Sequence, residues 1–272
     1  MIDCSRILIL LDGSEFSERS LDLLQGISTQ GVPTLLRVVS EPGAVSAAED
    51  YLKAVAASYE GETRALVRHS HDPAAEILEA ITEGEHDLVV LMTHGQSGLK
   101  RWVWGSVAED LVRRSPVPLL VGNPRREKGA ESAFRKVLVP LDGSDLADTA
   151  LRSTRSLGLS PEAEIVLFSS VWAETTENAL ALVEELDAAS EQARERLGSQ
   201  VAALSEEGVK ATSLVVTGQP ADSILSAAER VGADLIAMTT HGRTGVGRWL
   251  LGSVAERVLR ASTLPVLLVR VP

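Results

Sequence analysis

The sequence repeats a long segment, and this internal duplication constrains the fold more than any other feature. Asp87–Val121 aligns without a gap with Asp234–Leu268, and 17 of the 35 aligned positions are identical. Arg6–Ser14 and Lys136–Ser144 also match, and both end in Asp-Gly-Ser. The offset is 147 residues in the first pair of segments and 130 in the second, which is too long for a solenoid unit. Because the chain has 272 residues, we interpret it as a duplicated domain.

The junction between the two copies is polar. Asn123–Ser132 reads NPRREKGAES, a charged stretch with Pro and Gly that is typical of a linker. We expect the first domain over residues 1–124, the linker over 125–132 and the second domain over 133–272.

Each half alternates short aliphatic runs with helical patterns. Runs such as Ile7–Leu11 have the composition of parallel strands that are buried on both faces. The expected strands are Ile7–Leu11, Thr34–Val39, Arg64–Val67, Leu88–Met92 and Pro118–Val121 in the first half, and Val137–Leu141, Ile165–Ser170, Ala211–Val216, Leu235–Thr239 and Pro265–Val269 in the second. The helical region after the second strand is short in one half, Ala44–Tyr59, and long in the other, Glu177–Glu206. Pro73 and Pro220 mark the next helix start. The pattern predicts two tandem Rossmann-like α/β domains, each a five-stranded parallel doubly wound sheet with helices on both faces.

The polar residues that follow the first and fourth strands are candidates for a ligand site. Ligands of doubly wound sheets bind beyond the carboxyl ends of the strands, where the strand order reverses. This rule places Asp12 and the loop after Met92 at one mouth, and Asp142 and the loop after Thr239 at the other. An aspartate there can accept a hydrogen bond from a ligand, or it can close an Asx turn or cap the next helix. The sequence leaves both roles open.

The loop after the fourth strand has the same glycine spacing in both halves. It runs from Gly95 to Ser106 and from Gly242 to Ser253, and each copy ends in Gly-Ser. Glycine lets the backbone approach a ligand closely. A helix start presents N–H groups and the positive end of its dipole to an anion. These features predict a pocket for a phosphate chain.

The same serines also allow a purely structural explanation. Ser106-Val-Ala-Glu109 and Ser253-Val-Ala-Glu256 match the capping box, in which Ser and Glu satisfy the unpaired N–H groups of a helix start. Such a box stabilises a helix by about 1 kcal/mol without any ligand. The spacing alone does not decide between the two explanations.

The stretch THGRTGVGRWLLGSVAERVL, residues 240–259, resembles the universal stress protein family. The resemblance covers nearly the whole chain apart from the linker. ATP-binding members of that family carry G-x2-G-x9-G-[S/T] after the fourth strand, and both halves match its later elements. The resemblance implies ATP, with Mg²⁺, as the ligand, and an adenine contact by the aspartate that ends the first strand. The nucleotide-binding residues that it implies are Asp12, Val38, Met92, Gly95, Gly105, Ser106 and Val107 in the first half, and Asp142, Ser170, Thr239, Gly242, Arg243, Gly252, Ser253 and Val254 in the second.

The family resemblance also bears on assembly. Universal stress proteins similar to this one commonly dimerise by pairing their last strands antiparallel. We expect the two halves to do this within one chain, as a pseudo-twofold pair, and two such chains could associate further as a homodimer.

Both halves depart from the family motif. Its first glycine is replaced by Met92 in one half and by Thr239 in the other. Phosphate binding tolerates the replacement if only the main-chain N–H is needed there. Binding is weakened if that residue must have a positive φ. The family's G-x-P before the third helix is kept as Gly218–Pro220 and becomes His71–Pro73 in the first half. Ser170 replaces an apolar residue in the adenine slot. Because Thr is smaller than Met and the glycine of G-x-P is kept, we expect the second half to bind phosphates better.

Three further pairs of residues in the repeated loop have competing explanations. They are His94 and His241, Arg101 and Arg248, and Trp102 and Trp249. Neither histidine has a nucleophile or an orienting carboxylate at a recognisable spacing, which favours a loop hydrogen bond over acid–base catalysis. The arginines could neutralise phosphate or lie in solvent. The tryptophans are expected to anchor the loop on apolar surface rather than to stack on a base.

Composition excludes several classes of protein. The 38 acidic and 26 basic residues give a net charge of −12, which disfavours nucleic acid as a partner. No apolar run approaches the roughly 20 residues of a membrane span. We see no export signal and expect a cytoplasmic protein. Cys4 is the single cysteine, so an internal disulfide is excluded, and no Cys/His cluster has zinc spacing.

The sequence lacks the motifs of P-loop nucleotidases, nicotinamide dehydrogenases and serine hydrolases. The chain contains no G-x4-G-K-[ST], no G-x-G-x-x-G after a strand and no G-x-S-x-G. Efficient ATP hydrolysis needs a positioned metal, water and charge stabilisation, and the sequence shows no such set, so we name no catalytic residue and expect at most slow ATP hydrolysis. Three hypotheses follow: a nucleotide-dependent regulatory protein of the stress response, an interaction module that has lost nucleotide binding, and an ATP-consuming enzyme.

Overall fold

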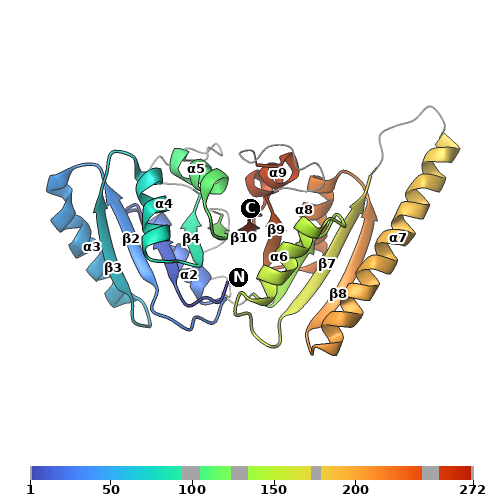
Figure 1. Ribbon diagram of the computed structural model, residues 1–272, viewed down its shortest axis with the longest axis horizontal. Coiled ribbons are helices and arrows are strands. Elements are labelled where there is room, and N and C mark those ends of the chain that lie inside the picture. The colour runs from blue at the N-terminus through green and yellow to red at the C-terminus, as the bar shows by residue number, and fades with distance from the viewer. Residues whose placement is uncertain (1, 94–104, 124–133, 173–178, 241–250, 271–272) are drawn as a thin grey trace.

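In the described part of the chain, ten strands form one continuous sheet. The computed structural model describes residues 2–93, 105–123, 134–172, 179–240 and 251–270. The strands are β1 (Ile7–Leu10), β2 (Thr34–Val39), β3 (Arg64–His69), β4 (Leu88–Met92), β5 (Leu119–Gly122), β6 (Lys136–Pro140), β7 (Glu164–Val171), β8 (Lys210–Thr217), β9 (Leu235–Thr239) and β10 (Val266–Val269). Their order across the sheet is β3-β2-β1-β4-β5-β10-β9-β6-β7-β8 (Figure 1).

The sheet consists of two halves with the same topology. Within each half all neighbouring strands pair parallel. At the centre β5 and β10 pair antiparallel, with Leu120 opposite Leu267. This confirms the predicted doubly wound sheets and the predicted pairing of the last strands within one chain. We call the β1–β5 half domain 1 and the β6–β10 half domain 2.

Helices cover both faces of this sheet. They are α1 (Glu15–Glu18), α2 (Ser20–Leu24), α3 (Val45–Ser58), α4 (Pro73–Glu83), α5 (Ser106–Arg114), α6 (Asp145–Arg155), α7 (Ala179–Glu206), α8 (Pro220–Val231) and α9 (Ser253–Ala261). One core cluster contains buried residues of α2, α3, α6 and α7, such as Leu52 and Leu197. The other contains those of α4, α5, α8 and α9, such as Ile77 and Val258. Figure 1 shows α3 and α7 at opposite ends of the molecule. None of the helices in the described segments is both long enough and apolar enough to cross a bilayer.

The helix after the first strand differs between the domains. Domain 2 has the single helix α6, as expected, whereas domain 1 has the two short helices α1 and α2. In domain 1 the hydroxyl of Ser17 donates to the Ser14 carbonyl at 2.8 Å, and that of Ser20 donates to the Ser17 carbonyl at 2.6 Å. Such local side-chain bonds compete with the regular helical bonds, which explains the break at Arg19.

The domain junction extends beyond the two central strands. The N–H of Ser28 donates to the carbonyl of Gly158 at 2.6 Å. Gly158 has φ of +69°, and a Cβ there would lie 2.4 Å from the Ser28 oxygen, so this close approach requires glycine. The thiol of Cys4 lies 3.4 Å from the carbonyl of Leu157, and burial raises its pKa to about 12. The thiol therefore stays protonated at neutral pH and serves as a buried contact between the domains.

Candidate functional site

Two cavities open at the carboxyl ends of the strands, one in each domain. Cleft 1 has a volume of about 290 Å³ and lies over β1, β2 and β4, beside the starts of α4 and α5. Cleft 2 has a volume of about 310 Å³ and lies over β6, β7 and β9, beside the starts of α8 and α9. The strand order reverses between β1 and β4 and between β6 and β9, where open α/β sheets bind ligands.

Every predicted site residue in the described part of the chain lines one of these clefts. Cleft 1 is lined by Asp12, Val38, Met92, Gly105, Ser106 and Val107, and cleft 2 by Asp142, Ser170, Thr239, Gly252, Ser253 and Val254. The predicted residues Gly95, Gly242 and Arg243 lie outside the described residues, as do His94, His241, Arg101, Arg248, Trp102 and Trp249.

The walls of both clefts are apolar. They are formed by Leu10, Leu36, Ile77 and Leu91 in cleft 1, and by Pro140, Phe168, Ile224 and Met238 in cleft 2. Apolar walls with a few polar groups are typical of small-molecule sites. The sequence reasoning missed these wall residues because an aliphatic residue in a strand or helix has the same pattern whether it faces a core or a cleft.

Strand register identifies equivalent wall positions on β2 and β7. The residue opposite the end of β1 is Leu36, and the residue opposite the end of β6 is Phe168. Val38 and Ser170 each stand two residues further along their strands, so they are counterparts, as the sequence comparison suggested.

The helices that border the clefts begin at the motif serines. α5 starts at Ser106 and α9 at Ser253, so Gly105 and Gly252 occupy the N-cap positions in extended conformation. Among the described residues no side chain caps either helix. In the described residues the N–H groups of each first turn thus have no side-chain acceptor, and groups of this kind can bind an anion.

The capping-box interpretation of these serines is wrong. Glu109 accepts a hydrogen bond from Arg113 at 2.7 Å, and Glu256 accepts one from Arg260 at 3.0 Å. Both glutamates thus pair with the next turn of their helix instead of reaching back to the N-cap. The reason is that glycine takes the N-cap position, which moves each serine one place into the helix.

The aspartates at the cleft mouths close Asx turns. Oδ1 of Asp12 accepts hydrogen bonds from the N–H of Ser14 at 2.9 Å and from its hydroxyl at 2.6 Å. Oδ1 of Asp142 accepts the same pair from Ser144, at 3.0 and 2.6 Å. The Asx turn, one of the two roles that the sequence left open, is therefore present in both domains. Because each turn also fixes its carboxyl group at a cleft, it is compatible with a ligand contact.

Comparison with models of known protein families identifies the family of this chain. The model of the Universal stress protein family matches residues 4–122 and 133–270. The chain belongs to the universal stress protein family. The two matched segments each contain one complete half of the sheet, so this universal stress protein is a tandem member with one copy of the family domain in each half.

Some similar proteins match about one domain, and others match nearly the whole chain. A universal stress protein of Methanocaldococcus jannaschii is 35% identical over 150 residues, which is 53% of this chain and 87% of the relative. One of Bacillus subtilis is 31% identical over 147 residues, 50% of this chain and 99% of the relative. The crystal structure of a universal stress protein from Archaeoglobus fulgidus superposes with a TM-score of 0.73 at 24% identity, covering 97% of this chain and 98% of that one. The last similarity supports the two-domain fold.

The two universal stress domains differ at the residue that ends the fourth strand. Met92 pairs with Gly122 in domain 1, and Thr239 pairs with Val269 in domain 2. A Cβ on Gly122 would lie 2.2 Å from the Met92 sulfur, so the methionine uses the space that glycine leaves. The Met92 side chain packs with the core cluster of α2 and α3, whereas Leu91 and the other apolar walls belong to the opposite cluster. Cleft 1 is therefore open with Met92 in place.

The turn before the third helix also differs. The N–H of Ser70 donates to the Val39 carbonyl at 3.0 Å, and the N–H of Gly218 donates to the Val171 carbonyl at 2.9 Å. Val39 and Val171 are equivalent in register, so the counterpart of Gly218 is Ser70. The spacing to the proline had indicated His71 instead. The turn of domain 1 contains one additional residue.

That longer turn changes the start of the helix beside cleft 1. Asp72 caps α4 by accepting a hydrogen bond from the N–H of Ala75 at 3.0 Å. In domain 2 the N-cap is Gln219, and no side chain of the described residues caps α8. The next residues, Pro73 and Pro220, line the clefts. Cleft 1 therefore has a carboxylate at the N-cap of its bordering helix, whereas the first-turn carboxylate of α8, Asp222, is paired with Arg257 at 2.8 Å. The sequence signal was available in the Asp-Pro dipeptide.

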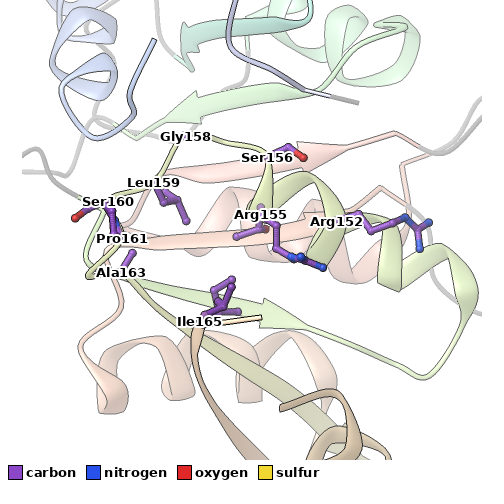
Figure 2. A pocket seen from close by; sticks show the side chains of 12 residues that line it. Arg152, Arg155, Ser156, Gly158, Leu159, Ser160, Pro161, Ala163 and Ile165 are labelled. Carbon is purple, nitrogen blue, oxygen red and sulfur yellow. The ribbon is translucent and has the colours of Figure 1, made fainter. Parts of the chain in front are cut away.

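A further cavity lies near the amino ends of β7 and β8, at the end of domain 2 opposite cleft 2. It measures about 530 Å³ and is bordered by Arg152 and Arg155 of α6, with Leu159 and Ile165 beside them (Figure 2). Arg155 forms an ion pair with Glu207. Arg152 donates a hydrogen bond to Thr149 at 2.7 Å. Both guanidinium groups are thus engaged by the chain itself, and none of the predicted site residues lines this cavity.

Proposed function

We propose that this tandem universal stress protein binds ATP as a regulatory ligand, and that cleft 2 is the stronger of its two sites. The observation that carries the proposal is the pair of helices α8 and α9, which start beside cleft 2 without a side-chain cap in the described residues. Helix starts of this kind stabilise phosphate groups through backbone N–H groups and the helix dipole. The first-turn amides of Ser253 and Val254 are the proposed phosphate donors.

The apolar part of cleft 2 suits a purine. Phe168, Ile224 and Met238 form its walls, and Asp142 stands at its mouth. A carboxylate oxygen can accept a hydrogen bond from the adenine amino group, which guanine lacks at that position. Ser170 adds a polar group to the wall where cleft 1 has Val38. This arrangement supports an adenine nucleotide rather than a guanine nucleotide.

A metal ion would enter the site with the nucleotide. Within the described segments no group of three or more His, Cys, Asp or Glu side chains is arranged to hold a cation. Mg²⁺ binds phosphate oxygens and water readily and needs few protein ligands. The chain's own contribution would therefore be to bind the phosphates and orient the base, with ATP turnover slow at most.

Cleft 1 is the weaker site on electrostatic grounds. The carboxylate of Asp72 caps the helix beside it and opposes the approach of a phosphate. This observation favours the second candidate function, an interaction module without nucleotide, for domain 1 alone. The two domains would then have different roles, with domain 2 regulated by nucleotide and domain 1 binding nucleotide only weakly.

Calorimetric titration of nucleotide-stripped protein with Mg-ATP tests the proposal. The matched variants are Gly252→Val and Gly105→Val, which place a branched side chain at the helix start in cleft 2 and in cleft 1. A Cβ on Gly105 meets no atom within 4 Å, so the second variant is expected to fold. Gly252→Val should remove most of the measured binding, and Gly105→Val should remove little. Equal effects of the two variants would contradict the ranking of the clefts, and absence of binding to the unmutated chain would contradict the function itself.

A further inference from the structure

The helix that starts at cleft 2 ends on a contact with the other domain. α9 starts at Ser253 and its C-cap is Ser262, whose N–H donates to the Val258 carbonyl at 2.8 Å. The carbonyl of Ser262 accepts a hydrogen bond from Nδ2 of Asn123. Asn123 follows β5 directly and therefore belongs to domain 1. The carbonyl at the C-cap of the phosphate-side helix of domain 2 thus accepts a hydrogen bond from the residue that follows the last strand of domain 1.

The same contact occurs with the domains exchanged. α5 starts at cleft 1 and its C-cap is Ser115, whose carbonyl lies 3.5 Å from Nη1 of Arg270. Arg270 follows β10 directly. In the repeat alignment Ser115 corresponds to Ser262, and Asn123 corresponds to Arg270. The crossed contact is therefore a pseudo-twofold feature of the junction in which the two donors differ.

Burial and further bonds make the Asn123 contact rigid. Asn123 is 4% exposed and Ser262 is 2% exposed. The hydroxyl of Ser262 also donates to the carbonyl of Leu264 and accepts from its N–H, both at 3.0 Å. The end of α9 is thus held on one side by its own entry into β10 and on the other by domain 1. A nine-residue helix spans roughly 13 Å, so a shift of its last turn moves the first turn that lines cleft 2.

We propose that Asn123 is a positioning residue for nucleotide binding in cleft 2, acting across the domain junction through Ser262 and α9. The proposal rests on the proposed function, because it concerns the phosphate-side helix of that site. Asn123 itself does not line cleft 2, so its effect comes from holding the helix and not from a ligand contact. The amide also satisfies a carbonyl at the negative end of the α9 dipole. By the same geometry Arg270 positions α5 for cleft 1, with a smaller effect because its contact is longer.

The test measures each cleft separately in the full chain. Asn123→Ala is combined with Gly105→Val, which leaves cleft 2 for ATP, and with Gly252→Val, which leaves cleft 1. Titration with Mg-ATP should show a Kd raised about 3- to 10-fold in the first background, the range expected for loss of one hydrogen bond, and an unchanged Kd in the second. Asn123→Gln, which keeps an amide donor, should recover part of the affinity. Equal losses in both backgrounds, or no loss in either, would overturn the proposal.

A second readout does not depend on nucleotide. The amides of Glu256 and Ser262 donate to the carbonyls of Gly252 and Val258, and their hydrogen exchange should accelerate about 3- to 10-fold in Asn123→Ala. The exchange of the equivalent Glu109 and Ser115 amides in α5 should stay constant. Arg270→Ala, at a half-buried position, should accelerate exchange in α5 by a smaller factor and leave exchange in α9 constant. This variant replaces Asn123→Ala if the latter fails to fold. If the unmutated chain bound no ATP, the proposed function would fail, and the exchange rates alone would decide the positioning role. Uniform exchange changes in both helices would contradict it.

Discussion

Cleft 1 and cleft 2 have the same topology and almost the same volume, yet their rims differ in charge and in side-chain size. Domain 1 combines Met92 with Gly122 and caps a cleft-side helix with Asp72, whereas domain 2 combines Thr239 with Val269 and leaves that helix without a side-chain cap in its described residues. The comparison shows two kinds of difference. Paired size changes leave the shape of the cleft intact, while Asp72 places a carboxylate at an N-cap beside cleft 1 that has no N-cap counterpart in domain 2.

The largest expected effect comes from breaking the size compensation in domain 1. Gly122→Val places a Cβ 2.2 Å from the Met92 sulfur and 3.0 Å from Cδ1 of Leu23. Overpacking of this kind lowers the free energy of unfolding by about 1–3 kcal/mol, which urea denaturation measures. Combining it with Met92→Thr copies the pair of domain 2 and should restore part of the loss, since Leu23 still has to adjust.

The matched experiment in domain 2 is Thr239→Met. Val269 occupies the space that glycine leaves in domain 1, so this variant should also be destabilised, and adding Val269→Gly should relieve it. Additive effects of Met92→Thr and Gly122→Val would show that the two positions are independent and would refute the compensation.

A second difference lies at the amino ends of the fourth strands. Oδ2 of Asp234 accepts two backbone N–H groups, from Arg135 at 3.0 Å and Lys136 at 2.9 Å. Its counterpart Asp87 accepts from the N–H and hydroxyl of Ser5 at 3.1 and 3.3 Å. Because burial raises the pKa of Asp87 and so disfavours its ionised form in the folded chain, Asp87→Asn should cost less than Asp234→Asn, by about 1 kcal/mol at neutral pH. Thermal or chemical unfolding of the two variants measures this.

The pH dependence of stability tests the environment of Asp87 directly. Burial raises the pKa of Asp87, as does its hydrogen bond with Asp3. The folded chain therefore holds this proton more tightly than the unfolded chain. The resulting stabilisation is fully present below the ordinary aspartate value of 3.8 and is lost as the pH rises through the folded value. The stability of the unmutated chain relative to Asp87→Asn should fall over that range, and parallel pH curves would contradict the assignment.

The smallest predicted effect concerns the charge beside cleft 1. Asp72→Asn keeps a side chain that caps helices as well as aspartate does and removes the negative charge, so stability should stay nearly constant. The affinity of cleft 1 for ATP should rise about 2- to 5-fold, the range of helix-terminus charge effects. The measurement is titration with Mg-ATP in the Gly252→Val background.

The control for this charge effect is the converse change in domain 2. Gln219→Asp introduces a carboxylate at the equivalent helix start, and in the Gly105→Val background it should weaken ATP binding by a similar factor. If neither substitution changed its cleft, the electrostatic ranking of the two sites would be wrong.

Much of the fold follows from the sequence because the duplication and the aliphatic runs are strong signals. The bounds of β2, β4 and β9 match the predicted runs. The antiparallel pairing of β5 with β10, which the family resemblance implied, is also confirmed. Parallel central strands need apolar residues on both faces, so a run such as Leu88–Met92 leaves little choice. The predicted site residues in the described segments also lie at the two clefts, since the topology brings the carboxyl ends of the strands together.

The remaining errors concern choices that depend on backbone conformation. Gly and Ser are both good N-cap residues, and only the structure shows that Gly105 takes that position and that Ser106 enters the helix. Counting back from Pro73 indicated His71 as the counterpart of Gly218, whereas the backbone hydrogen bonds show that the counterpart is Ser70. Asn123 belonged to a polar stretch typical of a linker, yet it is buried at the domain junction. Its role depends on a partner 139 residues away, which local patterns do not reveal.

The most direct test of the account is a crystal structure of the nucleotide-stripped protein soaked with Mg-ATP. We expect phosphate oxygens within hydrogen-bond distance of the backbone N–H groups of Ser253 and Val254, and adenine between Phe168 and Ile224 with its amino group toward Asp142. Density for the nucleotide only outside cleft 2, or with its phosphates turned away from the start of α9, would contradict the central claim.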